Sequence, residues 1–180
     1  MDDVTFPVTV GNSPLEEARP VRQSQQTMTQ LASPQDANLR GNVFGGVVLA
    51  AVDKIAYVCA TRHSDCPTVT ASFDQVDFRS PIEIGEIVTL RASVNYVGRT
   101  SMEVGVRVTA ESVSGGEPRH TNSCYVTMVA LDEDGRPRAV PRLVLENEVE
   151  YRRYLDAAER RKARLLLADQ RRQRRQKRRA

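Results

Sequence analysis

The sequence is poor in the residues that disulfide frameworks and metal clusters need. It has three cysteines, an odd number, and none of them forms a CxxC pair. That pattern argues against a disulfide framework or a zinc cluster and is typical of proteins in a reducing compartment. Two histidines, His63 and His120, are too few for a histidine-rich metal site, so we expect no bound metal.

Long apolar runs are also missing. No stretch of about 18 uncharged apolar residues occurs, as a membrane-spanning helix would require. The best candidate, residues 43–60, carries Asp53 and Lys54 in its middle. The first ten residues contain no basic segment followed by an apolar one, so no signal peptide is evident and we expect a cytoplasmic protein.

The charge is divided unevenly along the chain. Residues 1–150 contain 13 Lys and Arg against 20 Asp and Glu, whereas residues 151–180 contain 13 against 3. The net charge of +3 therefore combines an acidic body with a strongly basic tail, and the two parts need separate interpretations. We expect a flexible or strand-like arm over residues 1–20, a body over 21–145, and a basic helix and tail over 146–180.

The apolar pattern predicts one long helix followed by strands. The helix covers residues 43–64, is apolar on nearly every side, and has Asn42 as its expected N-cap. Short links predict that the strands form an antiparallel meander, preceded by a further strand within 21–32. The economical arrangement is an α+β fold in which a curved antiparallel sheet wraps the helix, with a C-terminal helix over about 146–170. The four strands are expected at Thr68–Phe78, Glu86–Val97, Ser101–Ser112 and His120–Asp132.

Asp53 interrupts the apolar helix at its centre. An unpaired carboxylate in an apolar interior costs several kcal/mol. One interpretation is a solvated notch, or a structural pair with Lys54 or an arginine. The other is a catalytic carboxylate whose pKa is raised by burial.

The start of the same helix offers hydrogen-bond donors. Gly45 and Gly46 lie in its first turn, where backbone N–H groups have no acceptor within the helix and a ligand can approach closely. Such donors can stabilise an oxyanion. Asn38, in the loop before the helix, is either a turn residue or a side chain whose amide holds an oxygen or a water.

Geometry separates these groups within one chain. Asp53 lies seven or eight residues beyond the glycine pair, about 10–12 Å along a helix. A two-fold dimer with neighbouring antiparallel helices would bring the glycines of one subunit to the aspartate of the other. The spacing therefore predicts sites shared between subunits.

The segment PQDANLRGNVFGGVVLAAVDKIAYVCA resembles the loop and central helix of hotdog-fold acyl-CoA thioesterases of the cytosolic acyl-CoA hydrolase family. FRSPIEIGE, VGRTSMEV and MVALDEDGRPRAVP resemble further family segments, with Glu86 where the family usually has Asp, and the similarity covers about residues 22–141. The first segment follows the family pattern P-x-x-x-N-x-x-G-x-x-F-G-G-x-x-x-x-x-x-D at Pro34, Asn38, Gly41, Phe44, Gly45, Gly46 and Asp53.

The resemblance implies hydrolysis of acyl-CoA to a free fatty acid and CoA. Asn38 and Asp53 would form the catalytic pair from opposite subunits, with Asp53 acting as base on water or as nucleophile. Gly45, Gly46 and Phe44 would bind the thioester. No cofactor is expected, since CoA is part of the substrate, and family members are often hexamers built from three dimers.

The phosphates of CoA need cationic and hydroxyl partners. The turn at residues 99–101 matches a family segment and is the favoured site, although its side chains could equally be ordinary hairpin residues. The candidates are Arg62, Arg79, Arg99, Thr100 and Ser101.

Two other functions stay open. A non-catalytic module could bind acyl-CoA in the same cleft without turnover. The tail Arg171–Arg179 could bind nucleic acid or an acidic membrane by charge alone, or could be a solubilising extension or a helix that packs in an oligomer.

Overall fold

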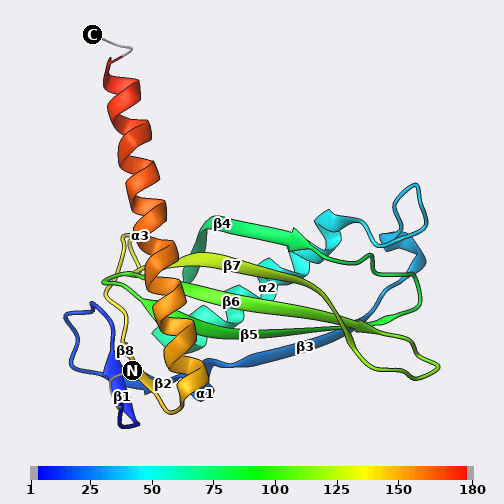
Figure 1. Ribbon diagram of the computed structural model, residues 1–180. Helices are drawn as coiled ribbons and strands as arrows, with labels where there is room; N and C mark the ends of the chain where they lie inside the picture. Colours follow the sequence, from blue (N-terminus) through cyan, green and yellow to red (C-terminus); the bar gives the residue numbers. More distant parts are fainter. Residues whose placement is uncertain (1–3, 178–180) are drawn as a thin grey trace.

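A five-stranded antiparallel sheet curves around one central helix in the computed structural model, which describes residues 4–177 apart from the side chain of Gln75 (Figure 1). The strand order is β3-β5-β6-β7-β4, with every neighbouring pair antiparallel. The predicted fold class is therefore confirmed. The elements are α2 (Gly45–Ser64), β3 (Gln26–Leu31), β4 (Thr68–Phe78), β5 (Ile87–Val97), β6 (Ser101–Glu111) and β7 (Arg119–Ala130).

The predicted four-strand meander is wrong at β4, which pairs with β7 at the edge of the sheet instead of with β5. The link between β4 and β5 has about eight residues, enough to reach across three strand spacings of about 4.8 Å each. Arg119 at the start of β7 pairs with Glu86 at the end of this link. A short link therefore does not require adjacent strands here.

One face of α2 supplies much of the core. Val52, Ala56 and Cys59 are fully buried against the concave side of the sheet. The prediction that this helix is buried all round is wrong for the single chain, because Tyr57 and Val58 remain 44% and 40% exposed.

The helix also starts later than predicted. Its N-cap is Phe44 rather than Asn42, so Gly45 is the first helical residue. Asn42 instead forms an isolated antiparallel bridge with Glu83 in the link between β4 and β5.

The first 20 residues contain strand structure rather than only a loose arm. Strands β1 (Val8–Val10) and β2 (Ala18–Pro20) flank β8 (Arg142–Leu145) in a second, three-stranded sheet. A one-turn helix, α1 (Val21–Ser24), follows, so the strand expected within residues 21–32 begins only at β3.

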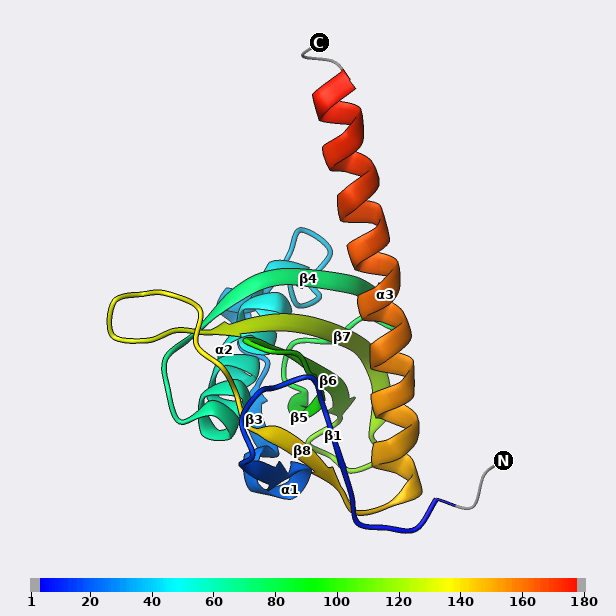
Figure 2. The same ribbon diagram turned by 90° about the vertical axis from the view of Figure 1, so that its left-hand side faces the viewer.

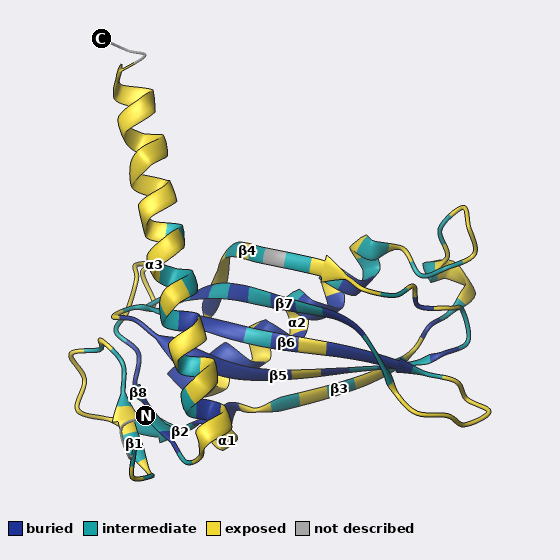
Figure 3. Cartoon of the chain, viewed as in Figure 1, coloured by how far each residue is buried: buried dark blue, intermediate teal, exposed yellow. Residues whose placement is uncertain are grey.

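The C-terminal helix α3 (Glu148–Lys177) extends beyond the range expected for it. Its first half packs on the convex face of the sheet, where Tyr154 stacks on Tyr96 with ring centroids 5.2 Å apart. Its second half projects away from the body (Figure 2) and is exposed (Figure 3) except at Arg164, which forms a salt bridge with Asp74 on β4. Among the described residues, no helix is long and apolar enough to cross a membrane.

Candidate active site

Hydrogen bonds within the loop before α2 and to the first residues of that helix hold the loop in place. A short 3₁₀ helix, Pro34–Asp36, is capped by Ser33, whose hydroxyl donates to the Asp36 carboxylate at 2.6 Å. That hydrogen bond holds the pKa of Asp36 below its usual range. The Phe44 N–H then donates to the Asp36 carbonyl at 2.8 Å, which ties the start of α2 to the loop that carries Asn38.

Asn38 uses its side-chain oxygen to organise this loop. Its Oδ1 accepts hydrogen bonds from the backbone N–H groups of Arg40 at 2.8 Å and Asn42 at 3.3 Å. Because the oxygen is engaged, the Nδ2 group is the part of the amide that is left to act as a donor. Asn38 is therefore both a turn residue and a potential donor to a carbonyl or a water.

Gly45 and Gly46 begin α2 between two exposed phenylalanine rings. Their N–H groups have no acceptor within the helix, by the geometry of any helix start. A Cβ on Gly45 would lie 3.3 Å from the Phe78 ring, and one on Gly46 would lie 3.0 Å from the Phe44 ring. Both rings are more than half exposed. Glycine therefore keeps the N–H groups accessible beside an apolar surface.

Asp53 is half-buried, and its partner is a hydroxyl. Thr70 on β4 donates a 2.5 Å hydrogen bond to Oδ1 of Asp53. Among the described residues no salt bridge involves Asp53, so the alternative of a pair with Lys54 or an arginine is not found. Sequence reasoning missed Thr70, because threonine is common in strands and gave no signal of its own.

A single chain does not bring Asp53 to the glycine pair. Gly45 is the first residue of α2, and Asp53 lies about 12 Å further along the helix axis at the standard rise. The two groups are therefore more than two helical turns apart within one subunit.

The candidates for binding CoA divide between the two ends of α2. The Arg99 carbonyl accepts from the Val140 N–H at 3.1 Å, and the next residue, Pro141, bonds to the His63 ring at 3.0 Å. His63 is the neighbour of Arg62, so this turn lies at the C-terminal end of the helix. Thr100 and Ser101 belong to the same turn.

Arg79 lies at the opposite end. It directly follows Phe78, whose ring is within contact distance of a Cβ placed on Gly45 at the helix start. Within one chain, the five candidates therefore do not form one cluster.

Comparisons with known proteins agree with this architecture. A family model described as the thioesterase superfamily matches residues 40–116. The protein VdlD of Helicobacter pylori is 47% identical over 137 residues, which cover 76% of this chain and 78% of that protein.

Two similar solved structures are named as acyl-CoA thioesterases or hydrolases. An apo-hexameric acyl-CoA thioesterase is 41% identical with a TM-score of 0.82, covering 84% of this chain and 97% of the other. The acyl-CoA hydrolase of Staphylococcus aureus, solved with butyryl-CoA, CoA and CoA disulfide, is 36% identical with a TM-score of 0.79, covering 85% and 95%.

Solved forms of the S. aureus hydrolase include three alanine variants, of an aspartate, an asparagine and a threonine. These three positions have the same spacing along that chain as Asp53, Asn38 and Thr70 have here. The asparagine variant is in complex with CoA.

The curved antiparallel sheet wraps a long helix, and the similar proteins are thioesterases. Together these findings define a thioesterase of the hotdog fold. The chain belongs to the hotdog-fold acyl-CoA thioesterase family, which confirms the resemblance found in the sequence.

Proposed function

We propose that this protein hydrolyses the thioester bond of acyl-CoA at sites shared between two subunits. Each site would combine Asp53 of one subunit with Asn38 and the Gly45–Gly46 helix start of a partner subunit. The observation that carries this proposal is the Asp53 carboxylate on α2, which is half-buried and held by the Thr70 hydroxyl. The matching spacing of three substituted residues in the S. aureus hydrolase supports the same assignment.

The chemistry is a transfer of the acyl group to water. Asp53 accepts a proton from a water molecule as the water oxygen bonds to the thioester carbonyl carbon. The N–H groups at the helix start and the Asn38 amide donate to the carbonyl oxygen as it becomes negative. Collapse of this intermediate breaks the carbon–sulfur bond, and the proton held by Asp53 passes to the departing thiolate of CoA. The reaction uses no cofactor, because CoA enters as part of the substrate.

The exposed surface beside Asp53 suits a second copy of the chain. Tyr57 and Val58 lie on α2 within about one turn of Asp53, and both are exposed. β4 is an edge strand, with Val69 and Phe73 also exposed. An apolar helix face beside an unpaired strand edge is a typical dimerisation surface. Two relatives of known structure are hexameric, which supports assembly of three such dimers.

Pairing through this surface also unites the candidates for CoA binding. If the two α2 helices lie antiparallel, the C-terminal end of one reaches the N-terminal end of the other. Arg62 and the Arg99–Ser101 turn would then lie near Arg79 of the partner subunit. A phosphate-binding site would thus be assembled across the same interface as the catalytic groups.

The comparisons with known proteins give no partner for the basic tail. Residues up to Lys177 continue α3 as an exposed helix, and the rest of Arg171–Arg179 lies outside the described residues. Binding of nucleic acid or an acidic membrane there stays a prediction, as does a cytoplasmic location.

The direct test compares Asp53→Asn with the wild-type protein. CoA released from a series of acyl-CoA substrates is followed with a thiol reagent. We expect wild-type turnover and release near background for Asp53→Asn, while Asp169→Asn, on the exposed part of α3, keeps wild-type activity. Tight acyl-CoA binding without wild-type turnover would instead identify a non-catalytic binding module.

A further inference from the structure

The outer part of α3, residues 165–177, projects beyond the edge strand β4 and away from the body of the molecule (Figures 1 and 2). Every residue in it is exposed. It consists mainly of Leu, Arg and Gln, which favour a helix even where no other element packs against it. The proposed hydrolysis assigns no role to this part of the chain.

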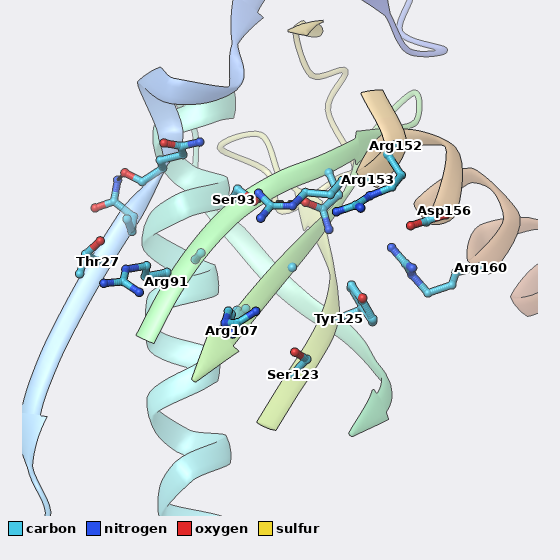
Figure 4. Close-up of a pocket in the computed structure, with 16 residues that line it drawn as sticks. Thr27, Arg91, Ser93, Arg107, Ser123, Tyr125, Arg152, Arg153, Asp156 and Arg160 are labelled. Atoms are coloured by element: carbon cyan, nitrogen blue, oxygen red, sulfur yellow. Dashed lines mark hydrogen bonds between the residues drawn. The ribbon is translucent and has the colours of Figure 1, made fainter. Parts of the chain in front are cut away.

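Arginines on the inner part of α3, residues 148–164, are held by the sheet. Cζ of Arg160 lies 3.6 Å from the centre of the Tyr125 ring (Figure 4), and the same guanidinium forms a salt bridge with Glu103 at 2.7 Å. One turn further out, Arg164 forms a salt bridge with Asp74 on β4. Both acids belong to strands of the sheet, and the helix passes the last strand at this point.

The same face of α3 carries unpaired arginines beyond the sheet. Arg164, Arg171 and Arg175 are seven and four residues apart, so they share one face of the helix. Neither Arg171 nor Arg175 forms a salt bridge among the described residues. Like charges four residues apart destabilise a helix, and a bound polyanion would remove that repulsion.

Positive charge is concentrated at the end of the outer part. Five of the seven residues 171–177 are cations, namely Arg171, Arg172, Arg174, Arg175 and Lys177. At about 1.5 Å per residue these seven occupy about 10 Å of helix, which is roughly one charge per 2 Å. Duplex DNA carries about one negative charge per 1.7 Å of its axis. The two charge densities are therefore closely matched.

Acidic groups of the chain do not neutralise this charge. Asp169, the one carboxylate of the outer part, accepts a 2.9 Å hydrogen bond from Gln173 instead of pairing with a cation. The body is acidic, with 20 Asp and Glu against 13 Lys and Arg in residues 1–150, and would repel a polyanion. The outer part is about 20 Å long, however, and charges are screened over about 8 Å at physiological salt. Its end can therefore bind a polyanion away from the charge of the body.

The distribution of apolar side chains favours a nucleic acid over a lipid surface. Leu165, Leu166 and Leu167 are consecutive, so they point in three directions about 100° apart and form no apolar stripe. No aromatic residue follows Tyr154 in the sequence. A helix that lies in a membrane surface has an apolar face, with Trp, Phe or Leu on it.

The shape of the outer part favours DNA among the nucleic acids. A helix with its side chains is about 10–12 Å across, and the major groove of B-DNA is about 12 Å wide. The major groove of duplex RNA is too deep and narrow to admit side chains. Arginine suits contacts along the groove, because its planar fork pairs with phosphate oxygens.

We propose that the outer part of α3 binds duplex DNA through the phosphate backbone, without preference for sequence. The cations of residues 171–177 contact phosphates on the two sides of the major groove. Asp53 and Asn38 take no part in this binding, so it is independent of the proposed hydrolysis.

Fluorescence anisotropy of a labelled DNA duplex of about 20 base pairs, titrated with the full chain, tests the proposal. The logarithm of the wild-type affinity should fall with the logarithm of the salt concentration with a slope of about −4, the value for four to five phosphate contacts. Between about 50 and 200 mM salt, binding should therefore weaken roughly a hundredfold. No saturable binding at about 50 mM salt, or a slope near zero, would contradict the proposal.

The double variant Arg171→Gln, Arg175→Gln removes two cations from one face of the outer part. Its affinity at about 100 mM salt should fall at least about tenfold, and its salt slope should be shallower by about two. The matched control Arg136→Gln, Arg138→Gln makes the same change in net charge on an exposed loop and should bind as the wild type does. Equal affinities of the two double variants would assign binding to net charge and overturn the proposal.

Other partners for the outer part give different results. Binding to vesicles with about one-third phosphatidylserine, or to an RNA duplex, with none to the DNA duplex would overturn the proposal. A smaller oligomer mass of the Arg171→Gln, Arg175→Gln variant in light scattering would overturn it as well, because the outer part would then pack against another subunit. Asp53→Asn should bind DNA as the wild type does, so failure of the hydrolase proposal is distinguishable from failure of this one.

Discussion

The Thr70 hydroxyl donates a 2.5 Å hydrogen bond to Oδ1 of Asp53, which links the edge strand β4 to the middle of α2. The bond fixes the orientation of the carboxylate and leaves Oδ2 as the oxygen free to receive a proton. Because β4 is also the surface proposed to meet the partner subunit, Thr70 connects the position of the catalytic group with the dimer interface.

Thr70→Val should lower kcat by about tenfold or more, because a hydrogen bond to a charged group contributes roughly 1.5–3 kcal/mol. The variant keeps the shape of the side chain and loses only the hydroxyl. Thr70→Ser restores the donor and should recover most of the rate. Equal kcat in the valine and serine variants would show that the hydroxyl does not act on Asp53.

Asn38→Asp separates the two roles of the asparagine. The carboxylate can still accept from the N–H groups of Arg40 and Asn42, so the loop should keep its fold. The donor to the thioester carbonyl is lost, so kcat/KM should fall by about 10²-fold or more. Thermal unfolding within error of the wild type would confirm an intact loop, whereas wild-type kinetics would contradict the catalytic role.

The Arg160–Glu103 pair anchors α3 to the convex face of the sheet. Glu103 is 2% exposed, and burial raises the pKa of its carboxyl even though Arg160 opposes that rise. Arg160→Met leaves this carboxylate unpaired, so urea unfolding should show a loss of about 3 kcal/mol.

The double variant Arg160→Met, Glu103→Leu should recover most of that loss, because it removes the buried charge as well. Arg171→Met, on the projecting half of α3, should have no effect. A double variant as unstable as the single one would mean that packing of Arg160 over Tyr125, and not its charge, holds the helix.

Acid should destabilise the protein through His63. The ring is fully buried, its Nε2 lies 3.0 Å from the Pro141 carbonyl, and its Nδ1 has no hydrogen-bond partner. Burial lowers the pKa of His63, while the unfolded chain keeps the ordinary value of about 6.5. Below that pH the unfolded state binds a proton that the folded state does not, so stability is constant above about pH 6.5 and falls below it.

Urea unfolding at pH 7.5 and 5.5 measures this effect, with an expected loss of about 1 kcal/mol for the wild type. In His63→Gln the difference between the two pH values should shrink, since the amide can still donate to Pro141 but does not titrate. An unchanged pH dependence in that variant would assign the effect to other groups.

The sequence predicted the features that depend on local pattern. The apolar run around Asp53 located the central helix, and alternation located four strands to within about two residues at either end. The sequence pattern did not predict the place of β4 in the strand order, because strand order depends on contacts between distant segments. Three-residue strands such as β1 and β2 are too short to show a period.

The same distinction applies to the candidate sites. Asn38, Gly45 and Asp53 lie on one loop and one helix, so spacing alone related them. Thr70 becomes a neighbour of Asp53 only because β4 packs against α2, which the sequence does not display. A threonine on a strand is therefore interpretable only once its partner across the fold is known.

The most direct test of the account mixes two inactive subunits. Co-expressed Asp53→Asn and Asn38→Asp chains form heterodimers in which one of the two shared sites has both wild-type residues. With random pairing, activity should return to about a quarter of the wild-type value. Mixed protein as inactive as either variant alone would show that Asp53 and Asn38 act within one chain, and would contradict a site shared between subunits.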